Sequence, residues 1–90
     1  MHHFRGVLFR DGRAVLDPAD VYVQYHTTEG GRGQGWYGYL LVAPEADVGP
    51  GGSYTLKLSD GRSGGLRVEA VTPDDSGKFR ATFFGEGPLG

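Results

Sequence analysis

The part of the chain with the strongest signature of a chemical site is a glycine-rich segment, residues 30–35 (GGRGQG), which leads into Trp36. Glycine-rich loops hold phosphates when their backbone N–H groups and the N-terminus of a following helix face the anion. Here Trp36 stands three residues after Gly33, where the dinucleotide pattern requires glycine, and no Gly-Lys-Ser or Gly-Lys-Thr sequence follows. We therefore interpret the segment as a hairpin loop before a strand. Arg32 and Gln34 could add polar contacts to a binding surface beside it.

Other candidates for catalysis or metal binding lack the partners that such chemistry needs. Asp74 and Asp75 lie in a turn-like sequence, where aspartate favours local backbone hydrogen bonds, outside any pocket of the kind that acid–base catalysis requires. His26 has no second histidine or carboxylate at a recognised metal-ligand spacing. The serines lack a nucleophile-elbow context, and the chain has no cysteine for disulfides or metal ligation. The sequence thus predicts a protein that is not an enzyme and holds no metal or cofactor.

The strand-like sequence that follows, residues 36–42 (WYGYLLV), is more informative because it is apolar toward both sides. Successive side chains of a strand point to opposite faces, so Trp36 lies on one face and Tyr37, Tyr39 and Leu41 share the other. In a small domain one face of a strand enters the core and the other meets water. Because exposed aromatic patches mark binding sites, we predict that Tyr37, Tyr39 and Leu41 form a contact surface. Trp36 would anchor the strand from the core side.

The second apolar face of this strand could be shielded from water in several ways. The loop at residues 44–52 or the C-terminal tail could fold over it, a second copy of the chain could bind it, or a foreign ligand could cover it. Tyr22 and Phe84 also lie off the core faces of their strands, and they would enlarge the surface if they neighbour the tyrosines. That depends on strand order, which the sequence does not reveal.

The elements that position these residues are short strands. Apolar and polar residues alternate with a period of two along most of the chain, and helical periodicity is nearly absent. Tight turns are predicted at residues 11–12 and 60–61, because both residues of an Asp-Gly pair tolerate positive φ. Residues 17–20 and 73–77 also have turn composition. The predicted strands cover residues 4–9, 14–16, 21–28, 36–42, 53–59, 65–71 and 78–84.

Short strands separated by glycine-rich turns predict a single all-β domain over residues 1–90. A small antiparallel barrel of six or seven strands fits best, because closure removes exposed strand edges; a two-sheet β-sandwich is the alternative. Asp-Gly-Arg occurs at residues 11–13 and again at 60–62. We attribute this repeat to convergent hairpin chemistry in preference to duplication.

The stretch from Leu66 to Ala81 resembles the part of immunoglobulin-like domains that ends in Asp-Ser-Gly-x-Tyr-x-Cys. Phe79 stands where that pattern has its corner tyrosine, and Ala81 stands where it has cysteine. The hydroxyl group that defines the tyrosine corner is therefore missing. We interpret the resemblance as convergent turn chemistry and assign no family from it.

Charge and composition narrow the range of partners. Nine basic and eleven acidic residues give a net charge of −2 without long runs of one sign, so the basic footprint of a nucleic-acid-binding protein is missing. No apolar run approaches the ~20 residues of a membrane-spanning helix, and the N-terminus has no secretory signal pattern. We therefore expect a cytoplasmic protein without membrane contact. His2 and His3, at the terminus, are expected to be disordered.

Together these features predict a non-catalytic binding or assembly module. It would self-associate, or bind a protein partner, through the aromatic strand. The alternative is a barrel whose aromatic side chains stack on single-stranded nucleic acid or on a glycan.

Overall fold

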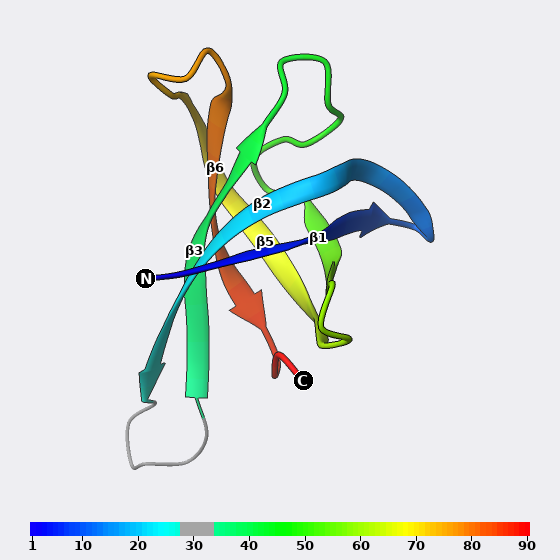
Figure 1. The fold of residues 1–90 in the computed structure, drawn as a ribbon, viewed down its shortest axis with the longest axis vertical. Helices are drawn as coiled ribbons and strands as arrows, with labels where there is room; N and C mark the ends of the chain where they lie inside the picture. Colours follow the sequence, from blue (N-terminus) through cyan, green and yellow to red (C-terminus); the bar gives the residue numbers. More distant parts are fainter. Residues whose placement is uncertain (28–33) are drawn as a thin grey trace.

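The computed structural model describes residues 1–27 and 34–90, and within these residues it contains six β-strands and no helix. Figure 1 shows the strands curving around a common interior. The strands are β1 (His2–Arg10), β2 (Arg13–Thr27), β3 (Gln34–Val42), β4 (Ser53–Leu58), β5 (Ser63–Pro73) and β6 (Phe79–Glu86). The predicted all-β class is confirmed. Thr28 and residues 30–33 of the predicted loop lie outside the described residues.

The six strands close into an antiparallel barrel in the order β1-β2-β3-β6-β5-β4, with β4 paired back to β1. The chain builds two meanders, β1-β2-β3 and β4-β5-β6, which join at a β3–β6 seam and a β1–β4 seam. Closure confirms the barrel over the sandwich. It also places β3 between β2 and β6, with the β1–β4 seam on the opposite wall.

The prediction was wrong at residues 17–20, where it placed a turn between two strands. These residues continue β2 as a single strand. The register with β1 shifts between Ala19 and Leu16, and β3 pairs with β2 only from Asp20 onward. Pro18 lies within this irregular stretch, where no regular pairing requires a backbone N–H from it. A proline that resembles a turn signal in isolation is therefore tolerated inside the strand.

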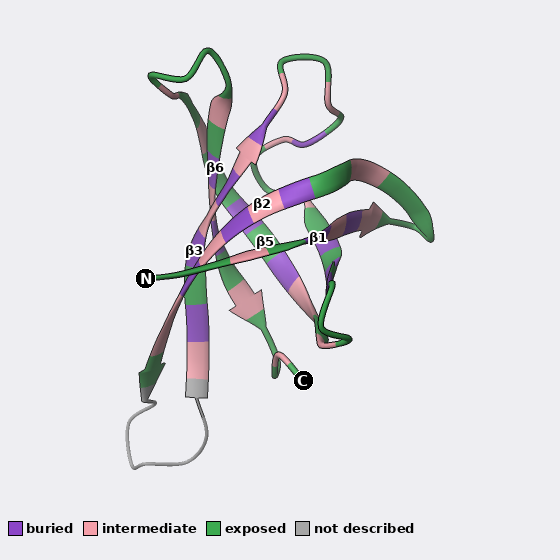
Figure 2. Ribbon diagram, in the orientation of Figure 1, coloured by how far each residue is buried: buried purple, intermediate pink, exposed green. Residues whose placement is uncertain are grey.

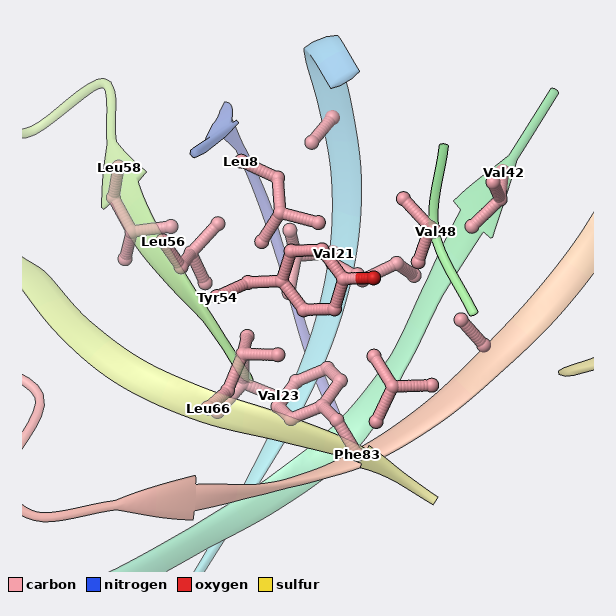
Figure 3. Close-up of a cluster of buried hydrophobic side chains, with 14 of the residues drawn as sticks. Leu8, Val21, Val23, Val42, Val48, Tyr54, Leu56, Leu58, Leu66 and Phe83 are labelled. Atoms are coloured by element: carbon pink, nitrogen blue, oxygen red, sulfur yellow. The ribbon is translucent and has the colours of Figure 1, made fainter. Parts of the chain in front are cut away.

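The interior is filled by inward-pointing side chains from all six strands, as Figure 3 shows. Figure 2 shows where these buried residues lie along the strands. The predicted alternation is confirmed in β4, where Tyr54, Leu56 and Leu58 are buried and the residues between them are exposed. Phe83, only 1% exposed, is the largest fully buried side chain. Each such side chain contributes about 1.5–3 kcal/mol through burial, so this packed interior holds the strands together.

Segments outside the strands seal the two ends of the barrel. At one end the loop between β3 and β4 places Val48 in the core, and the Gly49 N–H donates a hydrogen bond to the Tyr54 hydroxyl at 3.0 Å. At the other end the Trp36 Nε1–H donates to the carbonyl oxygen of Gly87, in the C-terminal tail, at 2.8 Å. Both segments that could have covered the outer face of β3 are therefore engaged at the ends of the barrel.

The two Asp-Gly-Arg sequences occupy corresponding places, in the first hairpin of each meander, but their geometry differs. Between β1 and β2, Asp11 (φ 51°) and Gly12 (φ 79°) both have positive φ and form the predicted tight turn. Between β4 and β5, Gly61 has a φ of 97°, whereas the Asp60 carboxylate accepts hydrogen bonds from the Arg62 backbone N–H and Nε. This difference favours separate hairpin chemistry as the origin of the repeat.

Gly38 marks a close approach of β2 and β3 that a larger residue would disrupt. A Cβ atom at this position would overlap the carbonyl oxygen of Tyr22. Gly38→Ala should therefore force the β2–β3 ladder apart and lower the free energy of unfolding by about 2 kcal/mol or more, measured by urea denaturation. Gly49→Ala is the matched control, because a Cβ there meets nothing within 4 Å. Equal effects of the two substitutions would contradict this account.

Candidate binding surface on the β2–β3–β6 wall

Strand pairing brings outward side chains of β2, β3 and β6 together on one wall of the barrel. Tyr22 lies opposite Tyr39 in the β2–β3 ladder, and Tyr37 lies opposite Phe84 in the β3–β6 ladder. Leu41 continues the outer side of β3. We call these five residues, Tyr22, Tyr37, Tyr39, Leu41 and Phe84, the aromatic face. Tyr22 and Phe84 therefore neighbour the tyrosines of β3, and the predicted surface extends onto β2 and β6.

A row of stacked groups crosses the aromatic face from β1 to β6. The rings of His3 and Tyr22 stack with centroids 4.7 Å apart, and those of Tyr22 and Tyr39 also stack at 4.7 Å. The Arg80 guanidinium carbon lies 4.1 Å from the centroid of the Tyr39 ring. We call these four residues the stacked row. Each contact contributes on the order of 0.5–1.5 kcal/mol, and together they fix the rings edge-on to the solvent.

The most exposed aromatic surface lies beside the stacked row. Tyr37 is 43% exposed and Phe84 is 40% exposed, and the two residues face each other across the β3–β6 seam. The His26 ring lies 5.6 Å from the Tyr37 ring and covers the bare backbone of Gly35, where a Cβ would overlap it. Tyr37 is therefore contacted on one side by His26, while much of the surface of both Tyr37 and Phe84 remains open to solvent.

Asp20 stabilises the β1 end of the stacked row through an ion pair and a hydrogen bond. Its carboxylate lies 3.1 Å from Nε2 of His3 and 3.5 Å from Nε of Arg5. The hydrogen bond with His3 is the main cause that lowers the pKa of Asp20 below its ordinary value; partial burial opposes this effect, and the charge of Arg5 adds to it. The interaction orients the His3 ring against Tyr22.

Asp74 stabilises the opposite end of the stacked row, at Arg80. Its carboxylate accepts hydrogen bonds from the hydroxyl and backbone N–H of Ser76 at 2.6 and 3.1 Å, and from Nη2 of Arg80 at 3.0 Å. The hydrogen bonds from Ser76, followed by that from Arg80, lower the pKa of Asp74. The expectation that this aspartate serves local hydrogen bonding in a turn is confirmed. Through Arg80 the same carboxylate also supports the guanidinium that covers Tyr39.

The predicted site residues divide into three groups. Tyr37, Tyr39 and Leu41 share the outer side of β3, as predicted. Trp36 is 2% exposed and packs edge-on against Phe83 with ring centroids 5.6 Å apart. It therefore lies on the core side of the strand, where it was expected to anchor it, and has almost no surface to offer a partner. Gln34 begins β3, and Arg32 lies outside the described residues.

Sequence reasoning missed the groups that hold the row in place. His3 was expected to be disordered; it lies in β1, opposite Tyr22, and stacks on it. Arg80 contacts the ring of Tyr39, and the sequence did not reveal this contact. No local signal could have found either contact, because both depend on which strands are neighbours and in what register.

The chain matches no protein-family model, and comparison with curated proteins and with solved structures finds no significant similarity. Among the described residues, no three histidine, aspartate or glutamate side chains lie close enough together to share a metal ion. The described part of the chain has no helix long and apolar enough to cross a membrane.

The lowered pKa of Asp20 predicts a specific pH dependence of stability. Its carboxylate stabilises the folded state fully above the unfolded pKa of about 4, and this contribution is lost as the pH falls through the lower folded value. Asp20→Asn should therefore be less stable than the wild type at pH 7, and the difference should shrink toward pH 2.

Urea denaturation at a series of pH values would measure this difference. Asp75→Asn is the matched control, because it removes an exposed carboxylate to which the described residues supply no ion pair. A difference between Asp20→Asn and the wild type that does not vary with pH would contradict the assignment.

Proposed function

We propose that this protein is a non-catalytic assembly module that self-associates through the aromatic face. The observation that carries the proposal is the exposed pair Tyr37 and Phe84, side by side on a rigid wall next to the stacked row. Tyrosine and phenylalanine bury large areas at low entropic cost when they are already held in place. Such a surface gains free energy when a second apolar surface excludes water from it.

Cover by the chain itself is the first alternative, and the contacts at the barrel ends argue against it. The loop between β3 and β4 packs Val48 into the core, and its Gly49 N–H donates a hydrogen bond to the Tyr54 hydroxyl. The C-terminal tail accepts a hydrogen bond from Trp36 at the carbonyl oxygen of Gly87. Neither segment is available to shield Tyr37 and Phe84.

Stacking on bases or sugars is the second alternative, and the geometry of the row disfavours it. A base or sugar needs the free face of an aromatic ring. The faces of Tyr22 and Tyr39 are occupied by each other, by His3 and by Arg80. In the stacked row only ring edges and hydroxyl groups remain, so stacking on a base or sugar would be limited to the exposed pair Tyr37 and Phe84.

Charge favours a second copy of the chain as the occupant. Around the aromatic face each arginine contacts a carboxylate: Arg5 with Asp20, Arg80 with Asp74, and Arg67 with Glu86. The face therefore has little net charge, so two copies can approach without the like-charge repulsion that would oppose a self-complementary contact. These pairs also leave no surplus of positive charge for phosphate groups.

Replacing the exposed pair should abolish association without unfolding the barrel. Tyr37→Ser/Phe84→Ser should raise the dissociation constant of the self-associated form at least about tenfold, since buried aromatic hot spots contribute about 2 kcal/mol or more. Sedimentation equilibrium over a range of concentrations would measure this change. Circular dichroism would show that the variant remains folded.

Phe9→Ser is the matched control, because it removes a partly exposed ring from the β1–β4 side and should leave association unchanged. A wild-type protein that stays monomeric at millimolar concentration would refute self-association. Fluorescence anisotropy with labelled single-stranded DNA and with a glycan pool tests the stacking alternative. Binding that is lost in Tyr37→Ser/Phe84→Ser would favour stacking on nucleic acid or glycan.

A further inference from the structure

A groove lies where β1, β2 and the β4–β5 hairpin meet, beside the β1–β4 seam. It encloses about 440 Å³ and is lined by residues of β1, β2 and the β4–β5 hairpin. The groove opens at the irregular stretch of the β1–β2 ladder, where Val7 faces Asp17 and Pro18 without regular pairing. On its other side β1 remains paired with β4, with Val7 opposite Lys57. The register shift thus creates a hollow without opening the barrel.

The groove combines an apolar floor with a cationic rim. Val7 and Pro18 line it, with the buried Leu58 beneath them. Arg5 and Lys57 stand at its edge. Asp20 contacts Arg5 at Nε, at 3.5 Å, and the guanidinium carries further N–H donors for another acceptor.

The charges define one kind of occupant. Lys57 forms no ion pair with the described residues. Arg5 also lines the groove, but its charge is paired with Asp20, and Asp17 adds a carboxylate to the lining. Lys57 is therefore the cationic group left for a ligand, with the N–H donors of Arg5 beside it. A single anionic group near Arg5 and Lys57 would be attracted, whereas the floor gives nothing to a fully hydrated anion such as inorganic phosphate. The volume is within the ~300–1,000 Å³ range of small-molecule sites.

We propose that this groove binds a small organic anion, a carboxylate or sulfonate attached to a flat apolar body. The anionic group lies between Arg5 and Lys57, and the apolar body lies on Val7 and Pro18. Asp17 repels the anionic group and so orients the ligand. This site adjoins the stacked row through the Arg5–Asp20 pair but contains none of the five aromatic-face residues, so either proposal can fail without the other.

Fluorescence titration with anilinonaphthalene sulfonate tests the site, because this probe carries one sulfonate on an aromatic body. The wild type should bind it saturably with one site per chain. Lys57→Gln and Val7→Ser should each weaken binding about threefold to tenfold, because they remove a charge-assisted contact and an apolar contact respectively. Phenylnaphthylamine, which lacks the sulfonate, should be insensitive to Lys57→Gln. Lys78→Gln, an exposed lysine in the β5–β6 turn, is the matched charge control.

Urea denaturation of each variant ensures that altered probe binding does not come from a loosened core. Unchanged affinity in both Lys57→Gln and Val7→Ser would overturn the proposal. Loss of probe binding in Tyr37→Ser/Phe84→Ser would also overturn it, because the probe would then be bound at the aromatic face. The absence of saturable binding to the wild type would have the same consequence.

Discussion

Closure of a sheet of six strands is the constraint on which the rest of this molecule depends. A barrel of so few strands has an interior only wide enough for its own side chains. Here Trp36, Phe83 and branched aliphatic residues fill that space. Because β3 pairs with β2 on one edge and β6 on the other, its second apolar set has no interior to enter. Tyr37 and Tyr39 must therefore stand on the outer wall.

The order of that wall comes from the register of the ladders. Tyr22 and Tyr39 meet because their strands pair at those positions, and His3 and Arg80 extend the same row on either side. The row uses ring faces for contacts within the chain and leaves ring edges outside. Side chains that are already ordered lose little entropy on binding, and this supports the proposed self-association.

The register shift between β1 and β2 has two consequences for the surface of the barrel. β3 does not pair with the first half of β2, and an unpaired strand edge can pair with another chain. The register shift and Pro18 make this edge irregular and so disfavour such pairing. The same shift parts β2 from β1 beside Val7 and leaves the hollow rimmed by Arg5 and Lys57. The two surfaces therefore differ in chemistry: one presents aromatic side chains, and the other is an apolar hollow with Arg5 and Lys57 at its edge.

Properties encoded by neighbouring residues could be derived from the sequence alone. The inner and outer sides of β3 and β4 follow from the alternation of side chains along a strand, and the Asp-Gly turns follow from local φ preferences. Pro18 was misjudged, because whether a proline needs its N–H depends on the strands beside it. The contacts of His3 with Tyr22 and of Arg80 with Tyr39 join residues far apart in the chain. Only the tertiary structure decides these contacts, because register and strand order arise from closure of the whole barrel and not from any single segment.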